Sequence, residues 1–300
     1  MASHVLTRPI SRNNPEITLA PVRKFIVLRQ LMHDKPALIG LVLLAILVGM
    51  AIFAPWVAPY DPAKTSPLAS LEGPSREHLL GTDSLGRDMF SRIVHGARWS
   101  LGAAATASAA IVVLGVTIGI VAGFFGGIVD AILMRLVDVL MAFPSMILAL
   151  AIVGMLGPSL RNVLIGMVAV WWVDYARIVR GITLRVVQND YVKAAHCCGC
   201  HPTRTMLRHI FPNVIPTVVV LATLELGSLI LAISGLSFLG LGAQPPTPEW
   251  GTMINEGRMF FLNEPQLMMY PGIAITLVVL ACNLVGDGLR DALDPRMHKR

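Results

Sequence analysis

The chain of 300 residues is 55% hydrophobic and 14% charged, and its mean hydropathy is +0.68. A soluble domain has about a quarter of its residues charged, so this composition excludes an ordinary soluble enzyme and indicates a protein embedded in a lipid bilayer. The net charge of +6 would suggest nucleic acid as a partner of a soluble protein. No stretch combines basic and aromatic residues into a nucleic-acid-binding surface, so no nucleic-acid partner is expected.

Apolar runs long enough to cross a bilayer recur along the chain. A helix needs about 20 predominantly apolar residues to span the hydrocarbon core, and it satisfies its own backbone hydrogen bonds there. Six stretches meet this requirement: 37–54, 100–123, 139–156, 162–179, 214–235 and 268–286. We therefore expect an all-α membrane protein with six transmembrane helices. The first run is long enough to span and has no cleavage site after a short core, so we expect it to remain in the mature chain.

The distribution of basic residues predicts which ends of these helices face the cytoplasm, because Lys and Arg are enriched in cytoplasmic segments near the membrane. With both termini inside, 17 of the 24 basic residues are cytoplasmic, namely Arg8, Arg12, Arg23, Lys24, Arg29, Lys35, Arg135, Arg177, Arg180, Arg185, Lys193, Arg204, Arg208, Arg290, Arg296, Lys299 and Arg300. The other 7 are external: Lys64, Arg76, Arg87, Arg92, Arg98, Arg161 and Arg258. The bias explains the net charge as a consequence of topology.

This orientation divides the chain into predicted parts. A polar, proline-containing cytoplasmic tail occupies residues 1–35, and the transmembrane domain occupies 36–296. Within that domain we expect external loops at 55–99 and 236–267 and a cytoplasmic loop at 180–212. A short cytoplasmic end, 297–300, completes the chain.

The stretch CCGCH at 197–201 matches C-x-x-C-H, the spacing that attaches c-type haem, and its Cys197-x-x-Cys200 core also matches redox and zinc motifs. The predicted topology places it in the cytoplasm, where thiols are kept reduced and covalent haem attachment is not expected. Cys282 lies within the sixth apolar stretch and cannot reach this loop. We therefore interpret the stretch as part of a helical loop and keep a metal-binding or redox role as the alternative.

Residues 190–213, DYVKAAHCCGCHPTRTMLRHIFPN, have the pattern of a helix, a turn and a second helix. The small Ala194 and Ala195 allow close approach of a partner, Gly199 permits a left-handed turn, and Pro202 suits the first turn of a helix. The alternative is an ordinary amphipathic surface loop.

These residues resemble the cytoplasmic "EAA" loop of ABC importer permeases, the element that docks on the ATP-hydrolysing subunit. Four further stretches, HLLGTDSLGRDMFSRIVHGARWSL, FFGGIVDAILMRLVDVLMAFPS, LSFLGLGAQPPTPEWGTMINEG and NLVGDGLRDALDP, resemble the second permease subunit of the dipeptide, oligopeptide and nickel branch of type I ABC importers. The resemblance covers about residues 36–296. It implies the type I permease fold and the residues of the ATPase-coupling loop: Lys193, Ala194, Ala195, Gly199, His201, Pro202, Arg204, Phe211 and Pro212. Lys193 departs from the family pattern, which commonly has Glu there.

The resemblance also implies partners and a location. Such subunits pair with a homologous permease, two ATP-binding subunits and an extracytoplasmic substrate-binding protein, and they lie in the bacterial inner membrane. The chain has no G-x-x-x-x-G-K-[ST] phosphate-binding loop, so we expect it to be non-catalytic, to bind no cofactor, and to leave ATP and Mg to its partner subunits. Di- or oligopeptides are the first expected cargo and nickel the alternative. A self-sufficient channel is a further alternative.

Three ionisable residues lie within the apolar stretches, where such groups tend to face a cavity or a partner. Asp138 and Asp174 each have an arginine three residues away, Arg135 and Arg177, so we expect both carboxylates to form local ion pairs. Glu225 has no such neighbour and lies about 18 Å along a helix from Asn213, near the middle of the bilayer. All three are candidates for the translocation path, with Glu225 first. The alternative for Glu225 is a buried polar contact to the partner permease.

Two external segments have local signals. Asp83 or Ser84 is a candidate N-cap for a short charged helix before the second span, and its charge pairs are expected to be structural. The prolines of 244–251 exclude a continuous helix, so this segment is predicted to be an external loop with Trp250 at the membrane interface.

Overall fold

The computed structural model describes residues 31–293, and within them the chain is helical and has no β-strand. The long helices are α2 (Lys35–Ile52), α4 (Met89–Phe125), α5 (Gly127–Met141), α6 (Ser145–Leu156), α7 (Leu160–Val187), α10 (Phe211–Phe238) and α12 (Gln266–Leu293). The shorter elements are α3 (Ala54–Val57), η1 (Pro67–Ala69), α8 (Asp190–Cys197), α9 (Pro202–Thr205), η2 (Met206–Ile210), α11 (Trp250–Gly257) and η3 (Arg258–Phe260). Most of the predicted tail 1–35 and the whole of 297–300 lie outside the described residues.

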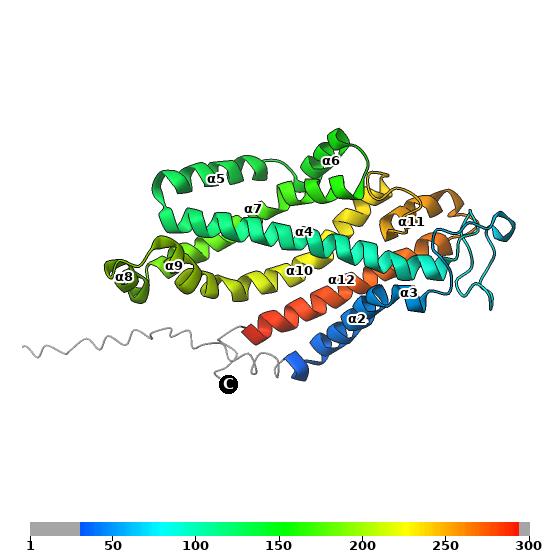
Figure 1. The fold of residues 1–300 in the computed structure, drawn as a ribbon, viewed down its shortest axis with the longest axis horizontal. Coiled ribbons are helices and arrows are strands. Elements are labelled where there is room, and N and C mark those ends of the chain that lie inside the picture. Colours follow the sequence, from blue (N-terminus) through cyan, green and yellow to red (C-terminus); the bar gives the residue numbers. More distant parts are fainter. Residues whose placement is uncertain (1–30, 294–300) are drawn as a thin grey trace, which may run out of the picture.

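The long helices form an elongated bundle (Figure 1). Within residues 31–293, five helical segments are long and apolar enough to cross a membrane, and the α5–α6 pair makes a sixth if it is counted as one span. Helices α8 and α9 lie at one end of the bundle, and α11 with the segment that precedes α4 lies at the other (Figure 1). We call these the α8 end and the α11 end; the charge distribution predicts that they are cytoplasmic and external, respectively.

The third predicted span is the one that differs most from a single helix. Residues 139–156 fall partly on α5 and partly on α6, and the axes of these two helices differ by 87°. The break lies at Ala142–Pro144, where Pro144 has no N–H for the helical ladder and disfavours helical backbone at Phe143. Asp138 therefore lies on α5, away from the apolar segment α6.

The second and fifth predicted spans belong to longer helices than their apolar runs indicate. Helix α4 begins at Met89 and is capped by Asp88, whose carboxylate accepts a 2.8 Å hydrogen bond from the Ser91 amide. The prediction of Asp83 or Ser84 as the cap is therefore wrong. At the α8 end, α10 continues backwards through η2, which has π-helical geometry, into α9, so that residues 202–238 form one continuous span.

Helices α4 and α7 run parallel, and three glycines of α4 bring them into close contact. An added Cβ would lie 2.4 Å from Tyr175 Cβ at Gly115, 2.6 Å from the Ala176 carbonyl oxygen at Gly119, and 2.7 Å from Thr183 Cβ at Gly123. Small residues at such positions let membrane helices approach closely, where van der Waals packing drives association. No other pair of elements is in more extensive contact in the described part of the chain.

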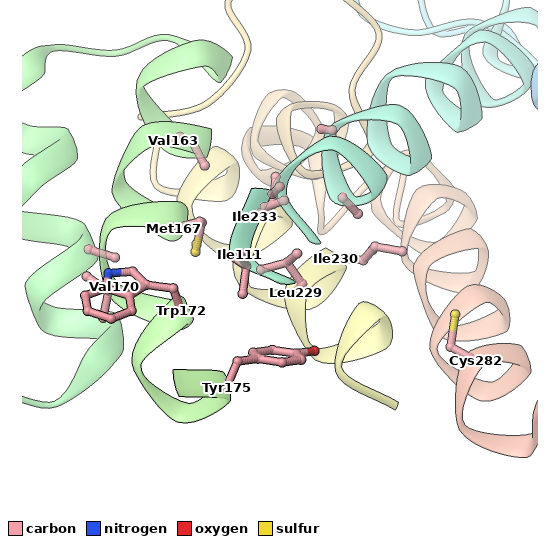
Figure 2. Packing of buried hydrophobic residues seen from close by; sticks show 14 of the residues in the cluster. Ile111, Val163, Met167, Val170, Trp172, Tyr175, Leu229, Ile230, Ile233 and Cys282 are labelled. Carbon is pink, nitrogen blue, oxygen red and sulfur yellow. The ribbon is translucent and has the colours of Figure 1, made fainter. Parts of the chain in front are cut away.

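Helix α10 packs against this pair and completes the core. Figure 2 shows Ile111 of α4 between Met167 of α7 and Leu229 of α10, and all three are buried. Helix α12 lies on the other side of α10 and carries α2 on its outer face. The order α7, α10, α12 across the bundle positions the cavity described below.

The α4–α7 contact predicts the effect of enlarging a glycine. In Gly119→Leu the new side chain would collide with the Ala176 carbonyl oxygen and the Val179 side chain. We therefore expect this variant to lower the free energy of unfolding by about 1–3 kcal/mol. The measurement is thermal unfolding of the purified protein in detergent. Gly181→Leu on α7 is the matched control, because a Cβ there meets nothing within 4 Å. Equal melting temperatures for the two variants would contradict the assigned packing.

Candidate functional site

A cavity of about 360 Å³ lies between α7, α10 and α12 and is open at the protein surface. Its polar lining comes from all three helices, and apolar side chains complete the wall. The lining residues are Asp174, Tyr175 and Ile178 of α7, Leu221, Leu224, Glu225 and Ser228 of α10, and Asn283 of α12. Two of the three predicted path residues, Asp174 and Glu225, therefore face one space although they are 51 positions apart in the sequence.

Tyr175 extends from α7 toward α10 at this cavity. Its ring is buried among core residues, and Figure 2 shows its hydroxyl pointing from α7 toward α10. Tyr175 and Glu225 therefore line the same cavity from two different helices. Sequence reasoning did not identify Tyr175. Its only signal was its position next to Asp174, which could not show the direction of its side chain.

The predicted ion pairs of the path candidates are wrong. Arg177 does not pair with Asp174; its guanidinium donates a 2.6 Å hydrogen bond to Asp138 on α5. Asp138 therefore pairs across helices instead of with Arg135, and it lies outside the cavity. The sequence argument considered only neighbours on the same helix, whereas the packing of α5 beside α7 brings a distant arginine closer. Asp174 is left with an exposed carboxylate at the cavity.

A second ion pair between the same two helices was not predicted. Arg180 on α7 forms a bidentate ion pair with Asp130 on α5. Its Nε lies 2.5 Å from one carboxylate oxygen and a terminal nitrogen lies 2.6 Å from the other. This geometry is the strongest that an arginine and a carboxylate can form. Together the two pairs fix α5 against the half of α7 nearest the α8 end, even though α5 itself is largely exposed.

The segment 190–212 contains the predicted helix, turn and second helix. Gly199 has φ +73° at the turn between α8 and α9, and Pro202 occupies the first turn of α9. Val192, Thr205 and Ile210 are buried and anchor the segment. The predicted coupling residues Lys193, Ala194, His201, Arg204, Phe211 and Pro212 are exposed, whereas Ala195 and Pro202 are half-buried. The segment therefore presents an open surface at the end of the bundle.

The cysteines of this segment form no disulfide. Cys197 and Cys198 are exposed and Cys200 is half-buried, all as free thiols. Among residues 31–293, no group of three or more His, Cys, Asp or Glu side chains is placed to hold a metal ion. The His201 ring instead contacts the Thr203 hydroxyl at 2.8 Å. The motif-like spacing thus coincides with a turn whose geometry depends on Gly199.

At the α11 end, a network of four charges, three of them buried and Glu256 half-buried, holds the segment before α4 against α11. The Arg87 Nε donates to Asp83 at 2.6 Å, and Arg87 and Arg92 each donate to the same Glu256 oxygen, at 2.8 and 2.6 Å. Arg92, which is 1% exposed, also contacts Asp83. The two arginines and two carboxylates balance in charge, as buried ions require. The charges that the sequence placed here therefore pair within the chain.

Trp250 does not lie at the membrane interface as predicted. It is fully buried at the start of α11, where its indole N–H donates a 3.0 Å hydrogen bond to the Ile93 carbonyl oxygen. The adjacent Glu249, also fully buried, caps α11 by accepting hydrogen bonds from the amides of Gly251 and Thr252. The proline-containing segment before α11 is a loop, and it leads into α11 where Trp250 contacts α4.

Known proteins resemble this chain over almost its whole length. Residues 115–299 match the family described as "Binding-protein-dependent transport system inner membrane component", and residues 26–74 match the N-terminal transmembrane domain of oligopeptide transport permease C. A dipeptide transport system permease protein of Alkalihalophilus pseudofirmus is 44% identical over 269 residues, which cover 90% of this chain and 88% of that protein. A nickel transport system permease protein of Escherichia coli K12 is 42% identical over 259 residues, which cover 86% of this chain and 94% of that protein. A glutathione transport system permease protein of Pectobacterium atrosepticum is 41% identical over 292 residues, which cover 97% of this chain and 96% of that protein.

Proposed function

We propose, on the premise that this chain belongs to the family of binding-protein-dependent transport system inner membrane components, that it forms half of the translocation path for di- or oligopeptides. The chain is a multi-pass membrane permease subunit of the peptide and nickel branch of ABC importers. A homologous second permease would supply the other half of the path. Two ATP-binding subunits with ATP and Mg would drive it, and an extracytoplasmic binding protein would deliver the cargo.

The observation that supports this proposal is the cavity between α7, α10 and α12. Carboxylates inside a membrane domain are costly unless they face water, a partner or a ligand, and this cavity carries Asp174 and Glu225 together. The Tyr175 hydroxyl and the Asn283 and Ser228 side chains add neutral hydrogen-bonding groups. A zwitterionic peptide has a protonated amine that two carboxylates attract, and amide groups that neutral donors and acceptors satisfy.

The segment 190–212 would couple this cavity to ATP hydrolysis. It connects α7 directly to α10, and these are the two helices that carry Asp174, Tyr175 and Glu225. A displacement of α8 and α9 by a docked ATP-binding subunit would therefore act on both walls of the cavity at once. The exposed coupling residues at its surface are available for such docking.

Nickel is the second candidate cargo, because a nickel permease is among the similar proteins. Ni²⁺ is well suited to imidazole ligands, and no histidine lines the cavity. The carboxylate, amide and hydroxyl groups suit a peptide better, and the dipeptide permease relatives match equally well. We therefore rank peptide first.

Replacing Glu225 tests the path. Glu225→Gln keeps the size and the hydrogen-bonding capacity of the side chain but removes the charge. We therefore expect ATP-dependent dipeptide uptake to fall about 10-fold or more, because a hydrogen bond to a charged group is worth about 1.5–3 kcal/mol. Uptake is measured in proteoliposomes that contain the whole importer. Asp138→Asn is the matched control, since Asp138 lies outside the cavity, and it should retain near-normal uptake. Wild-type uptake by a correctly assembled Glu225→Leu variant would exclude Glu225 from the path.

Replacements in the turn separate the role of the glycine from that of the thiols. Changing Cys197, Cys198 and Cys200 together to Ala should leave assembly and uptake intact, because the turn depends on backbone conformation. Gly199→Val should lower coupled uptake several-fold, since a β-branched residue disfavours the φ of +73° at this position. The measurement is the ratio of peptide transported to ATP hydrolysed. An inactive triple variant beside a normal Gly199→Val variant would favour the metal or redox alternative.

A further inference from the structure

A continuous groove follows α4 and α7 toward the α11 end. It consists of two open hollows of about 410 and 560 Å³, which share Thr106 and Leu164. Its floor on α4 is made of small residues that follow one helical face: Gly102, Ala103, Thr106, Ala107 and Ala110. Its wall on α7 is apolar and includes Leu160, Leu164, Ile165 and Val168. The groove is separate from the cavity at Glu225, with which it shares no lining residue.

The groove exists because α4 and α7 are in close contact along only part of their length. Gly115, Gly119 and Gly123 bring the helices together toward the α8 end, whereas a Cβ added at Gly102 would meet nothing within 4 Å. From Arg98 to Ala110 the groove follows 13 residues of α4, and the 12 steps between them span about 18 Å at 1.5 Å per residue. This is about half of a 30 Å hydrocarbon core, which corresponds to one leaflet.

The mouth of the groove is cationic and aromatic. Arg98, Trp99 and His95 line one hollow and Arg161 lines the other, all near the α11 end. No acidic residue lines either hollow, and within residues 31–293 neither arginine has an ion-pair partner. Trp99 is 47% exposed, and tryptophan is enriched at the level of lipid headgroups. The mouth therefore has the charge and polarity of a headgroup site, and the remainder has those of an acyl-chain site.

We propose that this groove binds one anionic phospholipid from the leaflet at the α11 end. One acyl chain lies along Gly102, Thr106 and Ala110, where the absence of larger side chains leaves room for it. The phosphate lies between Arg98 and Arg161. A transmembrane helix of a second protein is the competing occupant. An apolar helix would cover the two arginines without supplying negative charge, and burying an unpaired charge is costly. Charge complementarity therefore favours the lipid.

The test measures lipid retention by the whole importer purified from membranes. The complex is placed in detergent with equal amounts of phosphatidylglycerol and phosphatidylcholine, and bound lipid is counted by native mass spectrometry. We expect the wild-type protein to retain phosphatidylglycerol preferentially. The double variant Arg98→Gln, Arg161→Gln should lose that preference by roughly 10- to 30-fold, from two arginines that each attract an anionic lipid. Arg258→Gln, an exposed arginine outside the groove, should retain it.

A second variant separates a lipid from a protein occupant. Gly102→Trp fills the groove, and we expect it to lose the bound lipid while it still assembles with the second permease. Gly154→Trp, where an added Cβ also meets nothing within 4 Å, controls for the bulk of the side chain. Equal retention of the two lipids by the wild type, unchanged retention by the double variant, or loss of assembly by Gly102→Trp alone would each overturn the proposal. The last result would identify the groove as a contact between subunits.

Discussion

The close contact of α4 with α7 determines the geometry of everything else in the bundle. Gly115 meets the Cβ of Tyr175 and the carbonyl of Trp172, so the backbone of α7 rests directly on α4 at the level of the cavity. This contact sets the rotation of α7 and thereby directs Asp174 and Tyr175 toward α10 and α12. Closer to the α11 end this contact is lost, because a Cβ added at Gly102 would meet nothing within 4 Å, and the groove proposed to bind a lipid opens there. One stripe of small residues thus positions both sites.

The ends of the bundle are held in different ways. At the α11 end, ion pairs among Asp83, Arg87, Arg92 and the half-buried Glu256 hold the segment before α4 on α11. Removing one partner of such a pair would leave an uncompensated charge inside the protein. At the α8 end, α8 and α9 are exposed and attach to the bundle through few buried side chains. Rigid-body movement imposed by a partner would therefore enter at α8 and α9, and α7 and α10 would carry it to the cavity.

Much of the fold follows from local signals that the sequence contains. The apolar runs predicted the spans, because a bilayer requires about 20 such residues in a helix. Gly199 and Pro202 predicted the turn and the start of α9, because each has backbone preferences that act without tertiary contacts. The resemblance to importer permeases was confirmed by the family match over residues 115–299.

Apart from the helix cap at Asp88, the errors came from contacts between residues far apart in sequence. Asp138 was assigned to Arg135, three residues away, but helix packing brought Arg177 closer. Trp250 was placed at the membrane interface, yet the loop before α11 turns it into the core, where the Ile93 carbonyl accepts its hydrogen bond. Tyr175 gave no signal of its own. Only the relative rotation of α7 and α10, which no local pattern encodes, shows that Tyr175 lines one cavity together with Asp174 and Glu225.

The central claim is that this cavity is part of a path that opens alternately to the two sides of the membrane. Ser228 is exposed in the cavity, so a Ser228→Cys substitution, made after the four native cysteines are replaced by alanine, places one reporter thiol there. The importer is labelled in vesicles with a membrane-impermeant maleimide from each side, with and without a non-hydrolysable ATP analogue. Alternating access predicts labelling from one side without nucleotide and from the opposite side with it. Labelling from neither side in both states would contradict the claim, because the cavity would then be closed to water and cargo.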